Sequence, residues 1–127
     1  MILYLIRGLP GSGKSTYAKK LGCLVLEYDM FRIKDGVYNP KANANTVKKS
    51  VADMCGYALS KGVDVAVTGI FHTKKSLEDL IAFGKNMGAT VKIIKMSGNF
   101  DNIHNVPIIA VRGFKKNWEP IEGEIEL

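Results

Sequence analysis

A buried strand that runs directly into a glycine-rich turn constrains the fold of this chain more than any other feature. Residues 2–6 (ILYLI) form a continuous apolar run, which is typical of a parallel strand covered on both faces. Residues 8–15 then carry the pattern glycine, any four residues, glycine, lysine, serine, and residues 14–21 suit a short helix that stops near Gly22. A strand, a glycine turn and a helix in this order predict a loop that binds phosphate.

The remainder of the chain alternates between apolar runs and helical periodicity. We expect strands at 24–29, 64–69 and 90–96, and amphipathic helices at 46–61 and 74–87. Thr73 is placed to cap the second helix. We expect residues 30–45 to form a loop, in which a single helical turn can occur. Residues 106–118 suit a strand or a helix, and Pro107 favours the helix.

This alternation predicts an α/β fold in which a parallel sheet carries helices on both faces, linked by right-handed crossovers. At 127 residues the chain is expected to form a single small domain, residues 1–127, of the P-loop NTPase type. Ligands of such sheets bind beyond the carboxyl ends of the strands. We therefore expect the segments after Ile6, Asp29, Thr68 and Met96 to meet at one edge of the sheet.

The glycine loop is the first of these segments. Its glycines permit a backbone whose N–H groups point inward at phosphate oxygens. Lys14 would reach the β- and γ-phosphates of ATP, and the Ser15 hydroxyl would ligate Mg²⁺. The residues expected to bind the nucleotide are Gly8, Pro10, Gly11, Ser12, Gly13, Lys14, Ser15 and Thr16. A glycine-rich surface turn is the alternative, and the strand before the loop disfavours it.

The end of the second expected strand supplies a candidate base. Asp29 would project into the cleft, where its carboxylate can accept a proton from an attacking hydroxyl. Arg32, one helical turn later, could clamp a phosphate. Together with Lys14, these two are the expected catalytic residues. The alternative is a helix-capping aspartate followed by a solvated arginine.

The end of the third expected strand lacks an acid. Many phosphate-loop enzymes place a carboxylate that supports Mg²⁺ there, but this chain has Thr68 and Gly69, and Asp64 lies at the opposite end of the strand. Thr68 could hold a water bound to Mg²⁺. The side chains that follow can contact an anion or form a solvated loop and first helical turn: His72, Lys74 and Lys75.

The charge of the chain is unevenly distributed. The formal net charge is +6, and four of the twelve acidic side chains lie in the last nine residues. Residues 1–118 hold 18 basic and 8 acidic side chains, a balance that attracts nucleotides and nucleic acid and that equally suits a solubilising surface. The acidic tail, residues 119–127, can form an edge strand or a mobile segment.

The sequence also predicts a cytoplasmic protein that does not bind membranes. No apolar run reaches the length of a membrane span, and the apolar N-terminus lacks a basic leader and a small-residue cleavage site. Cys23 and Cys55 are too few for a disulfide framework and lack metal-ligand spacing. We interpret both as reduced thiols.

Four segments resemble, in order, those of the polynucleotide-kinase-type P-loop kinases, which include the phage 5′-hydroxyl kinases and the kinase domain related to Nedd4-binding protein two. They are RGLPGSGKST at 7–16, YDMFRIKDGVYNP at 28–40, NIHNVP at 102–107 and NWEP at 117–120. The resemblance implies that Asp29 is the general base that activates the acceptor hydroxyl. It also implies that Arg32 helps to hold the substrate.

The chain departs from that family in two places. The family carries aspartate-asparagine-threonine-asparagine after the third strand, where this chain reads TGIF at 68–71. The family also has a lid arginine just before its N-x-H motif, whereas here the lid, about 97–105, is shortened and Asp101 precedes the motif. A lid arginine stabilises charge on the transferring phosphoryl group. Arg7, Arg112 or a lysine is a candidate to replace it.

Three functions are compatible with these features. The first is a kinase that uses ATP and Mg²⁺ to phosphorylate a hydroxyl, above all the 5′-hydroxyl end of a nucleic acid. The second is a kinase acting on a nucleoside, nucleotide or sugar, because the same fold and base would serve. The third is a nucleotide- or nucleic-acid-binding protein with little catalysis, which the missing third-strand acid and lid arginine would suit.

Overall fold

The computed structural model of the protein describes residues 1–28, 33–34, 37–38, 44–98 and 108–127. Its helices and strands, in chain order, are β1 (Ile2–Arg7), α1 (Lys14–Lys20), β2 (Leu24–Glu27), β3 (Ile33–Lys34), β4 (Val37–Tyr38), α2 (Ala44–Ser60), β5 (Val65–Gly69), α3 (Lys74–Asn86), β6 (Thr90–Lys95), α4 (Ile108–Lys116) and β7 (Ile125–Glu126).

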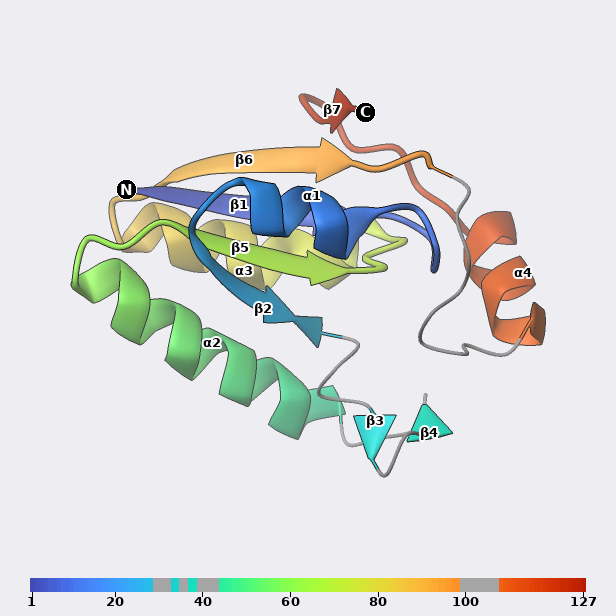
Figure 1. Ribbon diagram of the computed structural model, residues 1–127, viewed down its shortest axis with the longest axis horizontal. Helices are drawn as coiled ribbons and strands as arrows, with labels where there is room; N and C mark the ends of the chain where they lie inside the picture. Colours follow the sequence, from blue (N-terminus) through green and yellow to red (C-terminus); the bar gives the residue numbers. More distant parts are fainter. Residues whose placement is uncertain (29–32, 35–36, 39–43, 99–107) are drawn as a thin grey trace.

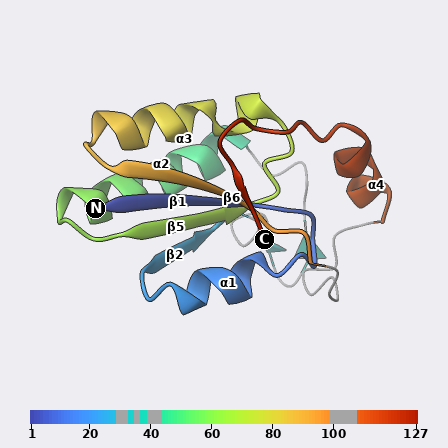
Figure 2. The same ribbon diagram turned by 90° about the horizontal axis from the view of Figure 1, so that it is seen from above.

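A parallel sheet of five strands forms the centre of the fold, in the order β2-β5-β1-β6-β7 (Figure 1). All four neighbouring pairs run parallel, as the alternation of strands and helices predicted. The register aligns Ile6 of β1 with Thr68 of β5, and Thr68 with Glu27 of β2. The carboxyl ends of these strands therefore meet at one edge, and α4 lies beyond that edge (Figures 1 and 2).

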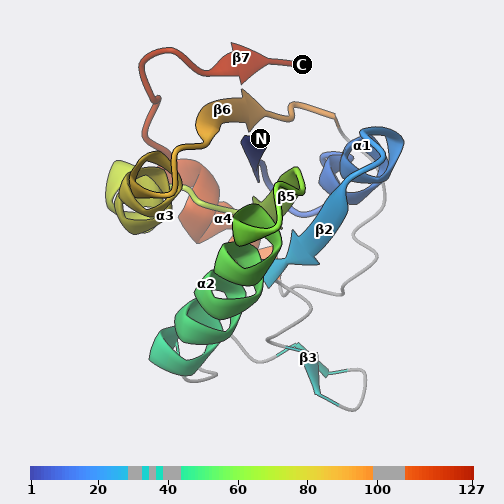
Figure 3. The same ribbon diagram turned by 90° about the vertical axis from the view of Figure 1, so that its left-hand side faces the viewer.

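Helices cover both faces of the sheet, which confirms the predicted P-loop NTPase-type architecture. Helices α2 and α3 lie on one face and α1 lies on the other (Figure 2), and Figure 3, which looks along the strands, shows the same separation of α1 from α3. The alternating side chains of β1 divide between them: Leu3 and Leu5 enter the core under α2 and α3, whereas Ile6 packs with Ala18 of α1. This two-residue period is what a strand buried on both faces requires.

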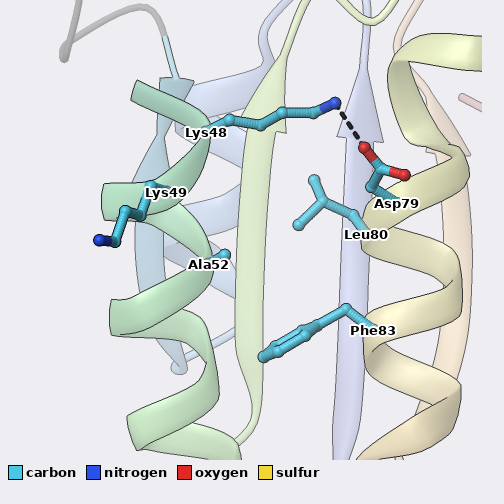
Figure 4. A pocket seen from close by; sticks show the side chains of 6 residues that line it. All are labelled: Lys48, Lys49, Ala52, Asp79, Leu80 and Phe83. Carbon is cyan, nitrogen blue, oxygen red and sulfur yellow. Dashed lines mark hydrogen bonds and ion pairs between the residues drawn. The ribbon is translucent and has the colours of Figure 1, made fainter. Parts of the chain in front are cut away.

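A shallow groove separates α2 from α3 on the outer surface (Figure 4). Its volume is about 290 Å³, and its lining consists of Lys48, Lys49, Ala52, Asp79, Leu80 and Phe83. Lys48 bridges the groove with an ion pair of 2.5 Å to Asp79, and this contact lowers the pKa of the Asp79 carboxyl. Both side chains are exposed, so we expect the pair to add little stability.

Most predicted elements match the structure, with small shifts at their ends. Thr73 caps α3 by accepting a hydrogen bond from the Ser76 backbone N–H, and the ambiguous segment after Pro107 is the helix α4. Met54 was expected on the buried face of α2, but it is 46% exposed.

One predicted loop needs correction, and the structure decides between the two alternatives for the acidic tail. The segment expected to be a loop contains the short antiparallel pair β3–β4. The acidic tail contains the edge strand β7, so the first of its two alternatives holds. Within the described residues, no helix is long and apolar enough to cross a membrane.

Candidate active site

The loop between β1 and α1 is closed by contacts that only glycine permits. Gly11 and Gly13 have φ angles of 81° and 93°, which L-residues with a Cβ rarely adopt. A Cβ on Gly8 would lie 2.3 Å from the Ser12 Oγ and 2.9 Å from the Met96 carbonyl oxygen. The Ser12 N–H donates to the Leu9 carbonyl at 3.0 Å. The loop therefore has the tight turn that its sequence predicts.

Lys14 lies inside this loop. Its side chain is 7% exposed, and its ammonium donates to the carbonyl oxygens of Gly8 at 2.7 Å and Leu9 at 3.1 Å. The cation is thus held beside the backbone that would surround a phosphate. The contact of Lys14 with the β- and γ-phosphates stays a prediction.

Ser15, the predicted ligand of Mg²⁺, contacts a carboxylate that the sequence analysis missed. The Ser15 hydroxyl donates a hydrogen bond to the Glu27 carboxylate. Glu27 is the last residue of β2, one strand away from Thr68 in register. A hydroxyl and a carboxylate are the hard oxygen donors that Mg²⁺ takes, so these residues fit the ion.

Strand alternation was the signal that could have found Glu27. Leu26 and Tyr28 of the same segment enter the core under α2 and α3, whereas Val25 packs on the α1 side. A side chain two residues after Val25 therefore faces α1 and the loop. The expected strand instead extended to residue 29, so its last acid, Asp29, was taken as the functional one.

The end of β5 explains why the third-strand acid is missing. Gly69 lies beneath the aromatic ring of Phe71, and a Cβ on Gly69 would lie 2.8 Å from two ring carbons. Phe71 has a φ of 44°, and its ring packs edge-on against Tyr28 with 5.2 Å between centroids. Aromatic packing occupies the space that an acidic side chain would need at Gly69. Thr68 is buried, and its predicted contact with a metal-bound water stays a prediction.

Arg7 does not replace the lid arginine. Its side chain is fully buried, and it pairs with the Glu124 carboxylate at 2.7 Å. It also donates to the backbone carbonyls of Phe71 at 2.9 Å and Glu119 at 2.8 Å. These partners hold the guanidinium in the interior and engage its nitrogen atoms. Arg112 is exposed on α4 and stays a candidate.

The C-terminal segment folds around Arg7. The Trp118 ring lies 4.2 Å from the Arg7 guanidinium carbon, so the segments RGLPGSGKST and NWEP meet in the structure although they lie far apart in the chain. Glu119 donates its N–H to the His72 carbonyl at 2.8 Å, and its carboxylate accepts the Lys74 N–H at 2.9 Å. The acidic tail therefore supports the base of the loop.

His72 belongs to this structural contact region. It is half-buried against Phe114, with 5.0 Å between ring centroids. Burial lowers the pKa of His72 below its ordinary value, and the positive charge of Arg7 lowers it further. Lys74 and Lys75 are exposed in the first turn of α3, which agrees with the interpretation of a solvated turn.

A cleft of about 520 Å³ opens beside the phosphate loop. Its lining joins loop residues to the end of β6 and to α4: Leu9, Ser12, Lys95, Met96, Ser97, Gly98, Lys115 and Trp118. Two of these side chains are basic and one is a large aromatic group. The Ser12 hydroxyl and the Trp118 indole N–H are buried without a hydrogen-bond partner among the described residues. The cleft therefore offers positive charge and unpaired donors next to the loop.

Two predicted catalytic residues, Asp29 and Arg32, lie outside the described residues, as does Asp101 of the lid segment. Their roles stay predictions. The eight residues expected to bind the nucleotide all lie in the loop or the first turn of α1.

A comparison with protein families matches residues 3–97 to the family described as an AAA domain. The chain belongs to this family. The matched region runs from β1 to the end of β6, so it contains the phosphate loop and Glu27. It is a P-loop kinase domain, and membership of such a family implies ATP binding. A search of the curated proteins found no match.

Solved kinase structures share the fold of this AAA domain. An unliganded sugar kinase from Janibacter sp. HTCC2649 aligns with a TM-score of 0.68 and 16% identity over 100% of this chain and 83% of that chain. A gluconokinase from Sinorhizobium meliloti 1021 aligns with a TM-score of 0.64 and 13% identity over 99% of this chain and 81% of that chain. A chain of a Pnkp1/Rnl/Hen1 complex aligns with a TM-score of 0.64 and 20% identity over 87% of this chain and 38% of that chain. At these identities the likeness establishes a common fold.

Proposed function

We propose that the chain is a Mg²⁺-dependent kinase that moves the γ-phosphate of ATP to a hydroxyl, with the 5′-hydroxyl end of a polynucleotide as acceptor. The observation that carries this proposal is the closed glycine loop, which places Lys14 inside it and the Ser15 hydroxyl against the Glu27 carboxylate. The loop brings hydrogen-bond donors for phosphate, a cation and metal-binding oxygens together at the carboxyl edge of the sheet.

Each residue of the site has a distinct role in this proposal. Backbone N–H groups of the loop from Gly11 to Thr16 hold the phosphates, and Lys14 neutralises charge on the β- and γ-phosphates. Ser15 would hold Mg²⁺, which supplies charge neutralisation on the phosphate oxygens when bound. Asp29 accepts the proton of the acceptor hydroxyl while the oxygen of that hydroxyl bonds to the γ-phosphorus. The bond from that phosphorus to the bridging oxygen breaks, ADP leaves, and Arg32 holds the substrate.

Charge supports a polynucleotide as the acceptor. Residues 1–118 hold ten more basic than acidic side chains, and Lys95 and Lys115 line the cleft beside the loop. Basic grooves that also present aromatic side chains suit single-stranded nucleic acid. Trp118 supplies such a side chain in this cleft.

A small-molecule hydroxyl is the second candidate acceptor. The aligned sugar kinase and gluconokinase share the fold over at least 99% of this chain, including the edge of the sheet where an acceptor would bind. Because the fold is common to several acceptor classes, it leaves the acceptor to the residues of the site.

A screen of acceptors by ADP release tests the proposal. We expect release with Mg²⁺, ATP and an oligonucleotide that carries a 5′-hydroxyl, and none with the same oligonucleotide carrying a 5′-phosphate. Asp29→Asn should abolish release and leave ATP binding intact, whereas the control Asp53→Asn, on the exposed side of α2, should change neither. Release with sugars or nucleosides alone would transfer the proposal to the second candidate. Unchanged release in Asp29→Asn would overturn the base assignment.

A further inference from the structure

We infer that Glu27 is the metal-positioning residue of this site: the carboxylate that supports Mg²⁺ comes from the end of β2 instead of the end of β5. The inference rests on the proposed function, because it concerns the metal that accompanies the bound nucleotide. It adds a residue and an element that the sequence pattern did not assign to the metal.

The contact between Ser15 and Glu27 carries the inference. The Ser15 hydroxyl donates a hydrogen bond to the Glu27 carboxylate, so the lone pairs of the Ser15 oxygen are left to face a cation. Ser15 lies next to Lys14 in the first turn of α1, at the mouth of the loop. A carboxylate that accepts a hydrogen bond from a metal ligand in this way orients that ligand and strengthens the bond of that ligand to the metal.

The neighbouring strand end cannot supply this carboxylate. Thr68 is the partner of Glu27 in the register between β2 and β5, and its side chain is neutral. The next position, Gly69, has its open side filled by the Phe71 ring. Glu27 therefore places an acid at the same register position as the end of β5, where the family's acid is missing, but on the neighbouring strand β2.

Four other acids of the described chain are engaged elsewhere, whereas Asp53, Glu78 and Glu122 are exposed on the surface. Glu124 pairs with Arg7, Asp79 pairs with Lys48, Glu126 pairs with Lys95, and Asp64 accepts the Ile2 N–H. Among the described residues, the cations near the loop are Lys14 inside it and Lys95 and Lys115 in the adjoining cleft, and Lys95 is the one paired with Glu126. Glu27 is thus the negative charge that the described structure places against a loop hydroxyl.

Mn²⁺ titration of the ADP complex tests the inference without requiring phosphoryl transfer. Mn²⁺ replaces Mg²⁺ at oxygen sites and is measured directly by electron paramagnetic resonance. In the full-length chain saturated with ADP, Glu27→Gln should weaken Mn²⁺ binding by about 10- to 100-fold, the usual effect of removing a residue that orients a metal ligand. Metal-free ADP binding should stay unchanged. Glu78→Gln, on the exposed side of α3, is the matched control and should bind Mn²⁺ like the wild type.

A double-mutant cycle separates positioning from folding. Ser15→Ala removes the hydroxyl through which Glu27 acts, so adding Glu27→Gln to it should weaken Mn²⁺ binding little further. Glu27→Asp, which keeps the charge, should recover part of the lost affinity. Wild-type Mn²⁺ affinity in Glu27→Gln would overturn the inference, and so would full additivity in the cycle.

The outcomes also separate this inference from the proposed function. Weakened Mn²⁺ binding in Glu27→Gln, without transfer from ATP to any hydroxyl in the wild type, supports Glu27 and overturns the kinase proposal. Transfer in the wild type with unchanged Mn²⁺ affinity in Glu27→Gln overturns only the role of Glu27. A wild-type chain that binds no ADP would overturn both.

Discussion

Arg7 and Lys14 are two buried cations at opposite ends of the same loop, and the structure uses them differently. Arg7 ends β1, faces the interior and is neutralised by Glu124. Lys14 begins α1 and donates to carbonyl oxygens of the loop itself. Burial alone therefore does not identify a catalytic cation. The two cations differ in position: the Glu124 carboxylate fixes Arg7 below the C-terminal segment, whereas Lys14 contacts the glycine loop that is predicted to bind phosphate.

The largest expected effect on folding is that of Arg7→Met. Removing one member of a buried ion pair leaves the other charge uncompensated, and Glu124 is only 13% exposed. We expect a loss of about 3–5 kcal/mol in the free energy of unfolding, measured by urea denaturation. Arg112→Met, an exposed position on α4, should change it by less than about 0.5 kcal/mol. Equal stability of Arg7→Met and wild type would refute the structural role of Arg7.

Lys14→Met should reverse this pattern. We expect kcat/KM for phosphoryl transfer to fall by about 10²- to 10³-fold, because the transition state loses a preorganised positive charge. The free energy of unfolding should change by no more than about 1.5 kcal/mol, since the lysine hydrogen bonds are made to carbonyls that water can reach once the side chain is shortened. Lys20→Met, exposed at the end of α1, is the control. A variant as unstable as Arg7→Met would erase the distinction between the two cations.

Glu124→Gln tests the other half of the ion pair. Glutamine removes the charge but keeps the shape and one acceptor oxygen, and the Phe71 and Glu119 carbonyls still accept hydrogen bonds from Arg7. We therefore expect a smaller loss of about 1–2 kcal/mol in unfolding free energy. Glu122→Gln, exposed in the same segment, should have almost no effect. A loss in Glu124→Gln as large as that in Arg7→Met would mean that charge alone, without the carbonyl contacts, holds Arg7.

The smallest expected effect is the pH dependence of stability that comes from His72, whose pKa is lowered by burial and by the Arg7 charge. Burial and the Arg7 charge place the pKa of His72 below its ordinary value of 6.5, so the folded protein binds fewer protons than the unfolded chain as pH falls through that region. Stability should therefore decrease as pH drops below about 6.5. Proton NMR measures the pKa, with His104→Gln identifying the resonance of His72, since the chain has two histidines. A pKa at or above 6.5 would contradict the described surroundings.

Local signals predicted most of the fold. Continuous apolar runs gave four strands of the sheet, helical periodicity gave α2 and α3, and the Thr73 cap was placed correctly. The glycine pattern predicted the loop because its chemistry depends on residues adjacent in the sequence.

Contacts between distant residues could not be predicted in the same way. Arg7 meets Glu124 across 117 positions, and the crowding at Gly69 comes from the ring of Phe71, not from the backbone angles of Gly69. Glu27 was missed because its role depends on how β2 and α1 are placed relative to each other. Such placement follows from tertiary packing, which single-residue patterns do not encode.

The identity of the phosphorylated product tests the central claim most directly. The wild-type chain would be incubated with Mg²⁺, ATP labelled in the γ-phosphate and an oligonucleotide carrying a 5′-hydroxyl, and the product would be mapped by nuclease digestion. The account predicts label on the 5′-terminal nucleotide, and none with Lys14→Met. ATP bound by the wild type, with label that never reaches this oligonucleotide or any other hydroxyl, would contradict it.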